Sequence, residues 1–589
     1  MRTSLEARKR FSLVLIKLSH YDDDGYVIQW LRSAIPSNTL AVMNGLALDC
    51  KERAVLGEDV EIDIRAWDET NTHVYPKELI RQLRGKPCLV ALIGVQSNQF
   101  PRALDVSRPL RAAGIQVCIG GFHVSGSLAM LPEMAPELKE AMSLGISLFA
   151  GEAEGRFEEV LRDAWQGTLK PLYDYMADLP TVEGSPAPIL PATRIKRTGG
   201  RITTFDAGRG CPFQCSFCTI INVQGRKSRR RSADEIEQIV RRNLAQGINR
   251  FFITDDNFAR NSDWEKVFDK LIPMREVEKL NLKFVIQVDT MCHRIPKFIE
   301  KAGRAGVARV FIGLESINPG SLVGARKKQN KVAEYRKMLL EWKRVGVTIF
   351  AGYIIGFPTD TPESVMRDIR TIQRELPIDL LQPHCLTPLP GSEDHQRLHK
   401  EGAYLDPDLN RYDLEHVTAA HATMSKDEWQ KLYHEAWSSY YSLEHIETVM
   451  RRSVATASNA GNMLFLLLWF YTCVNLEKLD PLEGGYLRRK HRKERRPTMP
   501  IESPFVFYPK YFGQLLRTHL ALIPLAWRFG RLRAQLKRDP NARNYTDLAL
   551  TPVADEEAGI SEIFQKTGPA KPVLVQLQAS ESVEAETVQ

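Results

Sequence analysis

Short, nearly uninterrupted apolar runs alternate with amphipathic stretches along the first 170 residues. The apolar runs have the length of buried strands and lie at Phe11–Leu18, Val90–Val95, Ile115–Gly120 and Ile146–Gly151. The segments between them have the spacing of helices, as in Tyr75–Arg84 and Ala103–Ala113. Buried strands that alternate with helices predict a parallel, doubly wound (Rossmann-like) sheet, and such sheets bind ligands beyond the carboxyl ends of their strands.

A second series of apolar runs follows between residues 197 and 430. Six of them read as strands at the spacing of repeated β–α units: 202–207, 250–254, 284–288, 309–314, 348–355 and 380–386. Ser232 and Glu235 have the pattern of a capping box, which predicts the start of a helix between the first two strands. The fold class is therefore α/β, with a second parallel sheet whose strand ends are the expected place for function.

Changes in composition divide the chain into five parts. We expect a Rossmann-like domain at 1–170, a Pro-rich linker at 171–196 and the second sheet at 197–430. Helical periodicity continues through 431–550, and the polar, acidic residues 551–589 are expected to form a disordered tail. At 589 residues the chain is too long for one core.

Composition and charge narrow the class further. Hydrophobic residues make up 43% and charged residues 26%, which is ordinary for a globular protein. Nine scattered cysteines fit a reducing compartment, and we see neither a cleavable leader nor an apolar run of membrane-spanning length, so a cytoplasmic protein is expected. The net charge of +8 is small, and the basic run 226–231 lacks stacking aromatics, so we do not expect nucleic-acid binding.

The most specific motif is the cysteine cluster that follows the strand at 202–207. Cys211, Cys215 and Cys218 have the spacing C-x3-C-x2-C, and thiolates are the ligands of iron–sulfur clusters. A structural zinc site would need a fourth ligand, and no Cys or His follows within the next dozen residues. Three thiolates leave one iron of a 4Fe-4S cluster open. With Phe217 between the last two cysteines, the motif resembles that of the radical SAM superfamily.

This resemblance implies a fold, two cofactors and a chemistry. The family fold is a partial (β/α)6 barrel, and its open iron chelates S-adenosylmethionine. An electron from the reduced cluster cleaves that molecule to a 5′-deoxyadenosyl radical, which abstracts hydrogen from an unactivated carbon. The residues that match the family's S-adenosylmethionine-binding positions are Phe217, Asp255, Asp256, Glu315 and Gly356.

The strand ends of the N-terminal domain resemble those of the cobalamin-binding domain that precedes the barrel in one radical SAM subclass. The matching residues are Gln96, Ser97, Gly120, Gly121, His123, Gly151 and Glu152. The family's Asp-x-His-x-x-Gly motif is absent, because the loop after the first strand reads Ser19-His20 followed by Gly25. This departure puts histidine ligation of cobalamin in question, and a sheet that only covers the barrel is the alternative.

Two apolar segments in the C-terminal region, 463–474 and 515–531, flank the basic run Arg488–Arg496. Such segments fit peripheral contact with the inner surface of an anionic membrane, where a lipid-like substrate would be found. The alternative is a buried helix packed on the barrel, beside a solvated charged loop.

These observations favour a radical SAM enzyme that functionalises an unactivated carbon, by cobalamin-dependent C-methylation. The alternative within the family is cyclisation, rearrangement or oxidation of a lipid or natural product without methyl transfer. A non-enzymatic electron-transfer scaffold would need a fully ligated cluster. The expected partners are a small-molecule substrate and a reductase, flavodoxin or ferredoxin as electron donor.

Overall fold

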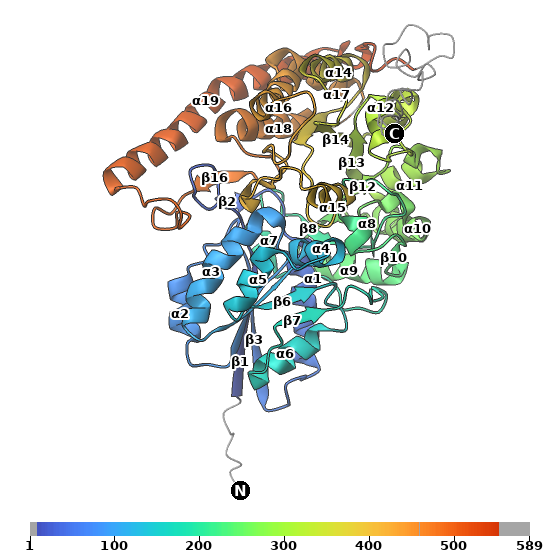
Figure 1. The fold of residues 1–589 in the computed structure, drawn as a ribbon. Coiled ribbons are helices and arrows are strands. Elements are labelled where there is room, and N and C mark those ends of the chain that lie inside the picture. The colour runs from blue at the N-terminus through green and yellow to red at the C-terminus, as the bar shows by residue number, and fades with distance from the viewer. Residues whose placement is uncertain (1–8, 457, 459, 553–589) are drawn as a thin grey trace, which may run out of the picture.

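The computed structural model describes residues 9–456, 458 and 460–552 (Figure 1). They form an α/β protein with two six-stranded parallel sheets and a mainly helical C-terminal region, which is the predicted fold class. Nearly all of the tail expected at 551–589 lies outside the described residues.

The N-terminal sheet has the strand order β3-β1-β4-β5-β6-β7, and every pair in it is parallel. Its strands are β1 (Lys9–Lys17), β3 (Val60–Asp68), β4 (Cys88–Leu92), β5 (Gln116–Gly120), β6 (Ser147–Ala150) and β7 (Leu172–Asp174). One face packs on α1 (Asn38–Glu52) and α6 (Phe157–Gln166), and the other on α2 (Pro76–Leu83), α3 (Phe100–Ala112) and α5 (Pro136–Ser143). Helices on both faces explain the nearly continuous apolar strands.

The second sheet follows the chain in reverse order, β15-β14-β13-β12-β11-β8, again with all strands parallel. Its strands are β8 (Thr203–Phe205), β11 (Arg250–Ile253), β12 (Lys283–Val288), β13 (Val307–Glu315), β14 (Thr348–Ile355) and β15 (Leu380–Cys385). All six coincide with predicted strands. Helices α9 (Ala233–Ala245), α10 (Trp264–Glu276), α11 (Phe298–Ala305), α13 (Tyr335–Arg344) and α14 (Pro362–Glu375) connect them, and α9 begins with the predicted capping box of Ser232 and Glu235.

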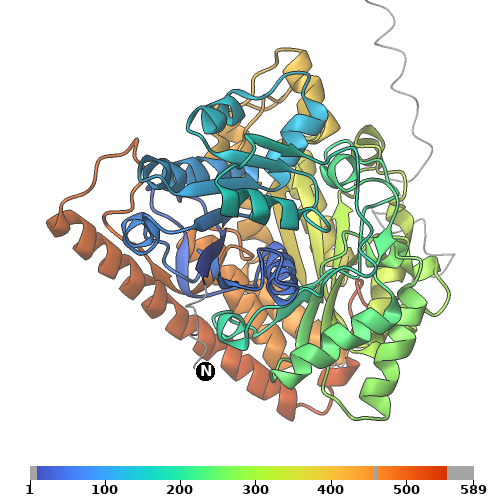
Figure 2. The same cartoon turned by 90° about the horizontal axis from the view of Figure 1, so that it is seen from below.

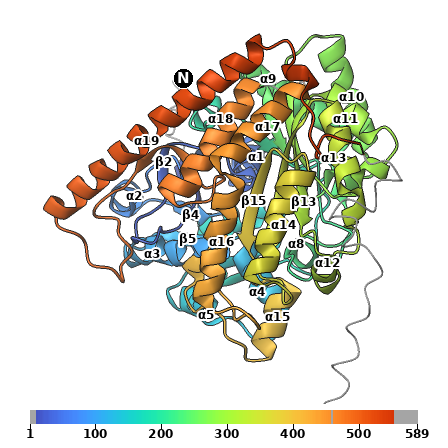
Figure 3. The ribbon, with the colours of Figure 1, turned by 90° about the horizontal axis from the view of Figure 1, so that it is seen from above.

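The C-terminal region packs on the barrel and returns to the N-terminal domain. Helices α16 (Lys426–Tyr440), α17 (Leu443–Ala455) and α18 (Ala460–Tyr471) share one apolar core with the barrel sheet. Strand β16 (Gly485–Arg489) pairs antiparallel with β2 (Gln29–Ser33). The last long helix, α19 (Pro504–Arg538), runs along the outside of the molecule (Figures 2 and 3).

The apolar run at 463–474 lies mainly in α18, where Met463, Leu467 and Phe470 are buried in the barrel core. The basic run 488–496 is not a solvated loop, because it forms ion pairs with the N-terminal domain and the barrel. Arg488 and Lys490 each lie 2.9 Å from Asp22, and Arg496 lies 2.7 Å from Asp408. Among the described helices, none is long and apolar enough to cross a membrane.

Candidate active site

The carboxyl ends of the strands in the two sheets face one another, and a cavity of about 380 Å³ lies between them. The N-terminal domain contributes Gln96, Ser97 and Asn98 to its wall, and β15 contributes Gln382 and His384. The remaining lining includes Thr219 and Ile220, which directly follow the cysteine motif. The cysteine loop is therefore positioned at the junction of the two domains.

The loop that carries the cysteines is closed at its base by a short antiparallel pair, β9 (Gly208–Arg209) with β10 (Arg229–Arg230). Gly210 has a φ of +91°, and a Cβ there would lie 2.5 Å from the carbonyl oxygen of Lys227, so the turn requires glycine. The three thiols are free, and Cys215 is buried. Burial raises the pKa of Cys211, and that of Cys218 to about 12.

Two residues outside the motif lie beside the cysteines and suit their negatively charged thiolate form. The side chain of Gln329 donates a hydrogen bond to Sγ of Cys215 (3.5 Å). Burial lowers the pKa of Lys327, but the charges of Glu315 and Cys215 raise it overall, so this lysine remains a cation beside the thiolates. Among the described residues, no three His, Cys, Asp or Glu side chains surround a single-ion position. In a 4Fe-4S cluster each thiolate binds a different iron, so the three cysteines can hold such a cluster without surrounding a single ion.

The structure separates the roles of the two adjacent acids after β11. Oδ1 of Asp255 accepts hydrogen bonds from the backbone N–H groups of Ala207 (2.7 Å) and Gly208 (2.8 Å), so Asp255 holds the strand that leads into the cysteine loop. Asp256 lies close enough to the cysteines for its charge to contribute to the raised pKa of Cys211 and Cys218. Burial raises the pKa of Asp256 to about 7. A bound ammonium group would offset that desolvation. Because Asp255 is already engaged by the backbone, Asp256 is a better candidate than Asp255 for binding the amino group of S-adenosylmethionine.

Glu315 ends β13 in a left-handed conformation (φ +63°) at a shift of register against β14. Its carboxylate forms an ion pair with Lys327. A Cβ on Gly313 would lie 2.6 Å from this carboxylate, so the glycine leaves room for the pair. Lys327 and Gln329 could not be predicted, since they follow the strand in a segment without a recognisable sequence pattern.

Gly356 lies where β14 ends, in a loop held by two contacts. Oδ2 of Asp360 accepts hydrogen bonds from the backbone N–H groups of Gly356 and Phe357, each 2.9 Å long. The indole N–H of Trp429 donates to the carbonyl oxygen of Ile355 (3.1 Å). The predicted Phe217 packs here too, against the apolar cluster of Ala325, Ile354 and Phe357. An apolar surface beside the cysteine loop suits the adenine ring of S-adenosylmethionine.

We expect Gly356→Ala to destabilise the protein by about 1–3 kcal/mol and to weaken S-adenosylmethionine binding. Gly356 has a φ of +110°, and a Cβ there would lie 1.8 Å from the buried ring of Trp429. Gly346→Ala is the matched control, because Gly346 also has a positive φ (+73°) but no atom within 4 Å of its Cβ position. Chemical denaturation and equilibrium binding measure the two effects. Equal losses in both variants would show that the Trp429 contact is unimportant.

The residues predicted to bind cobalamin are divided among three places. Gly120, Gly121, Gly151 and Glu152 line a largely apolar slot of about 170 Å³ between the strand ends and helices α1 and α6. Gln96 and Ser97 line the cavity between the domains instead. His123 is buried and hydrogen-bonded through both ring nitrogens, to Ser97 and Glu137 at 3.1 Å each.

The glycines at these strand ends are explained by the protein's own packing. Gly121 has a φ of +152°, and a Cβ there would lie 2.1 Å from the backbone nitrogen of Val95. A Cβ on Gly151 would lie 3.1 Å from the backbone of Tyr175. The glycines thus allow neighbouring strand-end loops to approach closely, and the slot lies alongside them.

Glu152 connects the N-terminal domain to the cysteine loop. It accepts a hydrogen bond from Nη1 of Arg209 (2.7 Å) and forms an ion pair with Arg229. Arg209 also pairs with Glu154 (2.5 Å) and Asp206 (3.1 Å). All five side chains are largely buried. Because Arg209 precedes Cys211 by two residues, this network fixes the distance between the domain and the cysteines.

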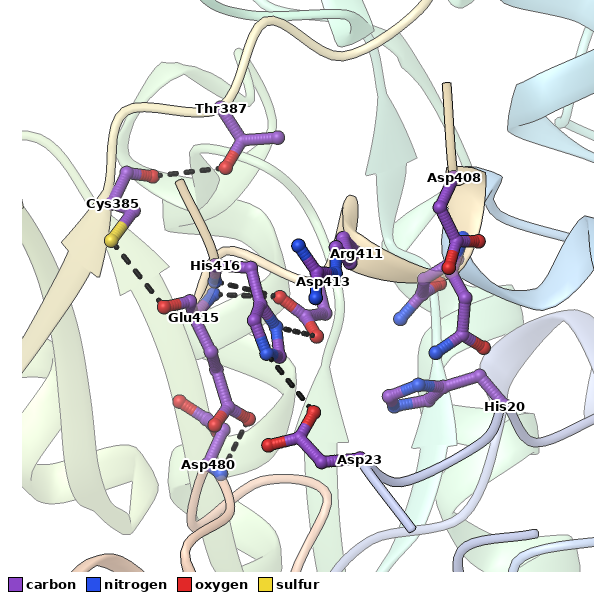
Figure 4. Close-up of polar contacts among 12 residues, drawn as sticks. His20, Asp23, Cys385, Thr387, Asp408, Arg411, Asp413, Glu415, His416 and Asp480 are labelled. Atoms are coloured by element: carbon purple, nitrogen blue, oxygen red, sulfur yellow. Dashed lines mark hydrogen bonds and ion pairs between the residues drawn. The ribbon is translucent and has the colours of Figure 1, made fainter. Parts of the chain in front are cut away.

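A cluster of acids and histidines borders the inter-domain cavity on its other side (Figure 4). Nδ1 of His416 lies 2.8 Å from Asp413, and its Nε2 lies 3.1 Å from Asp23. Burial alone would lower the pKa of His416, but hydrogen bonds with these two carboxylates raise it to about 10, so His416 is a cation. The carboxylate of Asp480 accepts two hydrogen bonds from Gln382 (2.7 and 3.0 Å), which fixes that side chain at the cavity wall.

This geometry defines the class of the protein. Residues 206–372 match the sequence model of the Radical SAM superfamily, and the match contains the three cysteines, Asp256, Glu315 and Gly356. Residues 206–372 are therefore a radical SAM domain, and the cofactors of such a domain are a 4Fe-4S cluster and S-adenosylmethionine.

Several proteins are similar over longer ranges. Bacteriochlorophyllide d C-8(2)-methyltransferase of Chlorobaculum tepidum is 26% identical over 359 residues, which cover 58% of this chain and 74% of that protein. Hopanoid C-2 methylase of Rhodopseudomonas palustris is 25% identical over 276 residues, covering 44% and 52%. Among solved structures, the cobalamin-dependent S-adenosylmethionine radical enzyme OxsB with aqua-cobalamin bound shares the fold. Its TM-score is 0.51 at 14% identity, and the alignment covers 92% of this chain and 82% of that one.

Proposed function

We propose that this enzyme uses cobalamin to methylate an unactivated carbon of an apolar small molecule. The named relatives are methyltransferases, and the similar solved fold is that of a cobalamin-dependent enzyme. In this proposal residues 1–170 bind cobalamin, 171–196 are a linker, 197–430 form the radical SAM barrel and 431–550 the helical extension. The observation that carries it is a series of three adjacent cavities, each sharing wall residues with the next, from the N-terminal strand ends into the barrel.

The slot and the inter-domain cavity are adjacent and suit a two-part ligand. Phe122 lines both, and the cysteine-side helix α8 (Ile220–Val223) borders the slot through Val223 and the cavity through Ile220. Oδ1 of Asn38, on the slot wall, is buried without a hydrogen-bond partner among the described residues. An apolar slot with an unpaired acceptor fits a nucleotide-like tail, and the cavity beside the cysteines fits a flat ring.

Histidine ligation from below the ring is not part of this proposal. His20 is hydrogen-bonded to Glu483 (2.5 Å) and His123 to Ser97 and Glu137. Among the described residues, no histidine lines the slot. The departure from the Asp-x-His-x-x-Gly motif therefore agrees with where these histidines lie.

The substrate class follows from the barrel interior. A chamber of about 290 Å³ lies between the inner face of the sheet and α18. The strands contribute Phe252, Val285, Phe311 and Phe350, and α18 contributes Phe465, Leu466, Trp469 and Phe470. The chamber meets the inter-domain cavity at a shared wall of Gln382, His384, Leu414 and Leu482. An apolar, lipid-like substrate would bury its body here and present one carbon toward the cofactors.

When bound, the cluster and cobalamin supply the electron and the methyl group. The chain's own residues position the cofactors and the substrate. Asp256 and the Gly356 loop orient S-adenosylmethionine, and the aromatic walls of the chamber exclude water and hold the substrate.

We further propose a reductase, flavodoxin or ferredoxin as electron donor. The nine free cysteines suit the reducing cytoplasm. Within that compartment we propose peripheral attachment to the inner membrane surface, where a lipid-like substrate would be available.

The test is cobalamin content together with product analysis. We expect near-stoichiometric cobalamin after anaerobic purification from cells supplied with the vitamin. Turnover with an apolar substrate should yield S-adenosylhomocysteine alongside 5′-deoxyadenosine. A folded protein with an intact cluster but without cobalamin would contradict the proposal. 5′-Deoxyadenosine alone would favour cyclisation, rearrangement or oxidation without methyl transfer.

A further inference from the structure

The outer face of α19 carries a continuous apolar stripe that no other described segment covers. Its members recur every three or four residues, which places them on one side of the helix. All are at least 47% exposed, from 47% at Tyr508 to 91% at Phe505, and they are Phe505, Tyr508, Phe512, Leu516, Leu520, Ile523 and Trp527. Single exposed apolar residues are ordinary, whereas seven aligned along one helix form a patch that marks an interaction site.

The stripe is separate from the face through which α19 packs on the protein. That opposite face buries Phe507, Thr518, Phe529 and Leu536. Tyr511 belongs to it as well and donates a hydrogen bond to the carbonyl oxygen of Arg488 (2.8 Å). The packing of α19 on α17 and α18 is thus complete without the stripe. A helix that is apolar on two opposite sides has one side for the core and one for a partner.

The charge of α19 indicates what that partner is. Its 35 residues contain seven Lys or Arg and no Asp or Glu. They are Lys510, Arg517, Arg528, Arg531, Arg533, Lys537 and Arg538. The guanidinium of Arg531 lies 4.6 Å from the ring centre of Trp527, at the edge of the stripe. An apolar stripe with aromatic residues, bordered by cations only, matches the headgroup region of an anionic bilayer.

We propose that α19 is an interfacial helix that attaches this protein to an anionic phospholipid membrane through the stripe Phe505–Trp527. In the basic run 488–496, three of the seven cations, Arg488, Lys490 and Arg496, are already paired with Asp22 and Asp408, which reduces the charge that the run can offer to a membrane. Helix α18 lies between α19 and the barrel chamber, and its Phe465 both lines the chamber and is 55% exposed. Attachment through α19 therefore brings the wall of the chamber that α18 forms close to the bilayer. This link to substrate supply rests on the proposed function, whereas the attachment itself does not.

Vesicle flotation with the full-length protein tests the attachment. We expect binding to vesicles of equimolar phosphatidylcholine and phosphatidylglycerol, weaker binding to phosphatidylcholine alone, and release by salt. The double variant Leu516→Glu/Ile523→Glu should lower the affinity for anionic vesicles at least about tenfold, because two buried side chains are lost from the bilayer. Val277→Glu/Val323→Glu is the matched control, since these valines are 76% and 67% exposed elsewhere on the surface.

Undiminished vesicle binding by the stripe variant, or no binding by the wild type, would overturn the proposal. Light scattering tests whether a second copy of the chain covers the stripe instead of a membrane. The proposal would also be overturned if the wild type formed a dimer and did not bind vesicles, and if the stripe variant were a monomer. Cobalamin content and dithionite-driven cleavage of S-adenosylmethionine are measured on the same samples without vesicles. If both remain at wild-type levels while vesicle binding is lost, the attachment is supported separately from the proposed chemistry.

Discussion

Replacing Cys218 by Ala is expected to reduce reductive cleavage of S-adenosylmethionine to the background rate. The cysteine loop supplies three thiolates, and two are too few to hold a 4Fe-4S cluster in this buried setting. The cluster is the entry point for the electron, so its loss removes the reaction and not merely part of its rate. Formation of 5′-deoxyadenosine with dithionite as reductant measures the activity, and iron and sulfide analysis measures the cluster.

Cys50→Ala serves as the control for loss of a buried thiol. Cys50 is 3% exposed and lies on α1, outside the loop that carries the motif. We expect this variant to retain its iron and its activity. Wild-type iron content and cleavage in Cys218→Ala would show that the cluster is bound elsewhere.

Arg209→Gln should lower the free energy of unfolding by about 3–5 kcal/mol, because it removes the cation that three buried carboxylates share. Arg209 pairs with Glu152, Glu154 and Asp206, whose side chains are 7%, 3% and 3% exposed. Since the arginine also joins the N-terminal domain to the cysteine loop, cobalamin retention should fall with stability. Urea unfolding followed by circular dichroism measures the first effect, and absorbance after gel filtration measures the second.

Arg304→Gln is the comparison for an exposed ion pair. Arg304 pairs with Glu276 at 2.9 Å, with the two side chains 47% and 45% exposed. Its loss should cost much less stability than the loss of Arg209, because solvent screens an exposed ion pair. If both variants lost the same small amount, the network around Arg209 would not be what holds the domain against the loop.

Most of the two sheets could be predicted from the sequence, because parallel strands buried on both faces leave continuous apolar runs. Two strands were missed, β3 and β7, which form the two edges of the N-terminal sheet. Strand β3 alternates apolar residues with Glu61, Asp63 and Arg65, and β7 is only three residues long and lies within the predicted linker. The pairing of β16 with β2 was equally hidden. Two short strands more than 400 residues apart leave no local pattern that relates them.

In the site, too, features that depend on neighbouring residues in the sequence could be predicted, and contacts between distant segments could not. The cysteine spacing is local, and so the motif could be recognised directly. The sequence could not show that Asp255 is engaged by backbone N–H groups whereas Asp256 lies close to the cysteines. Nor could it show that Glu152 pairs with Arg209 across the domain boundary, since that contact depends on how two sheets approach one another. Lys327 and Gln329 become visible only when the barrel brings their loop to the cysteines.

The pairing of β2 with β16 has a consequence for biosynthesis. The indole N–H of Trp30 donates to the carbonyl oxygen of Glu483 (2.8 Å), and Ile28 and Trp30 are buried together with Leu479. The partner segment is made roughly 450 residues later, which at about 5–20 residues per second takes on the order of half a minute or more. During that time the nascent N-terminal domain exposes an apolar segment that only the end of translation covers. Ribosome-associated chaperones are the factors on which its yield should depend.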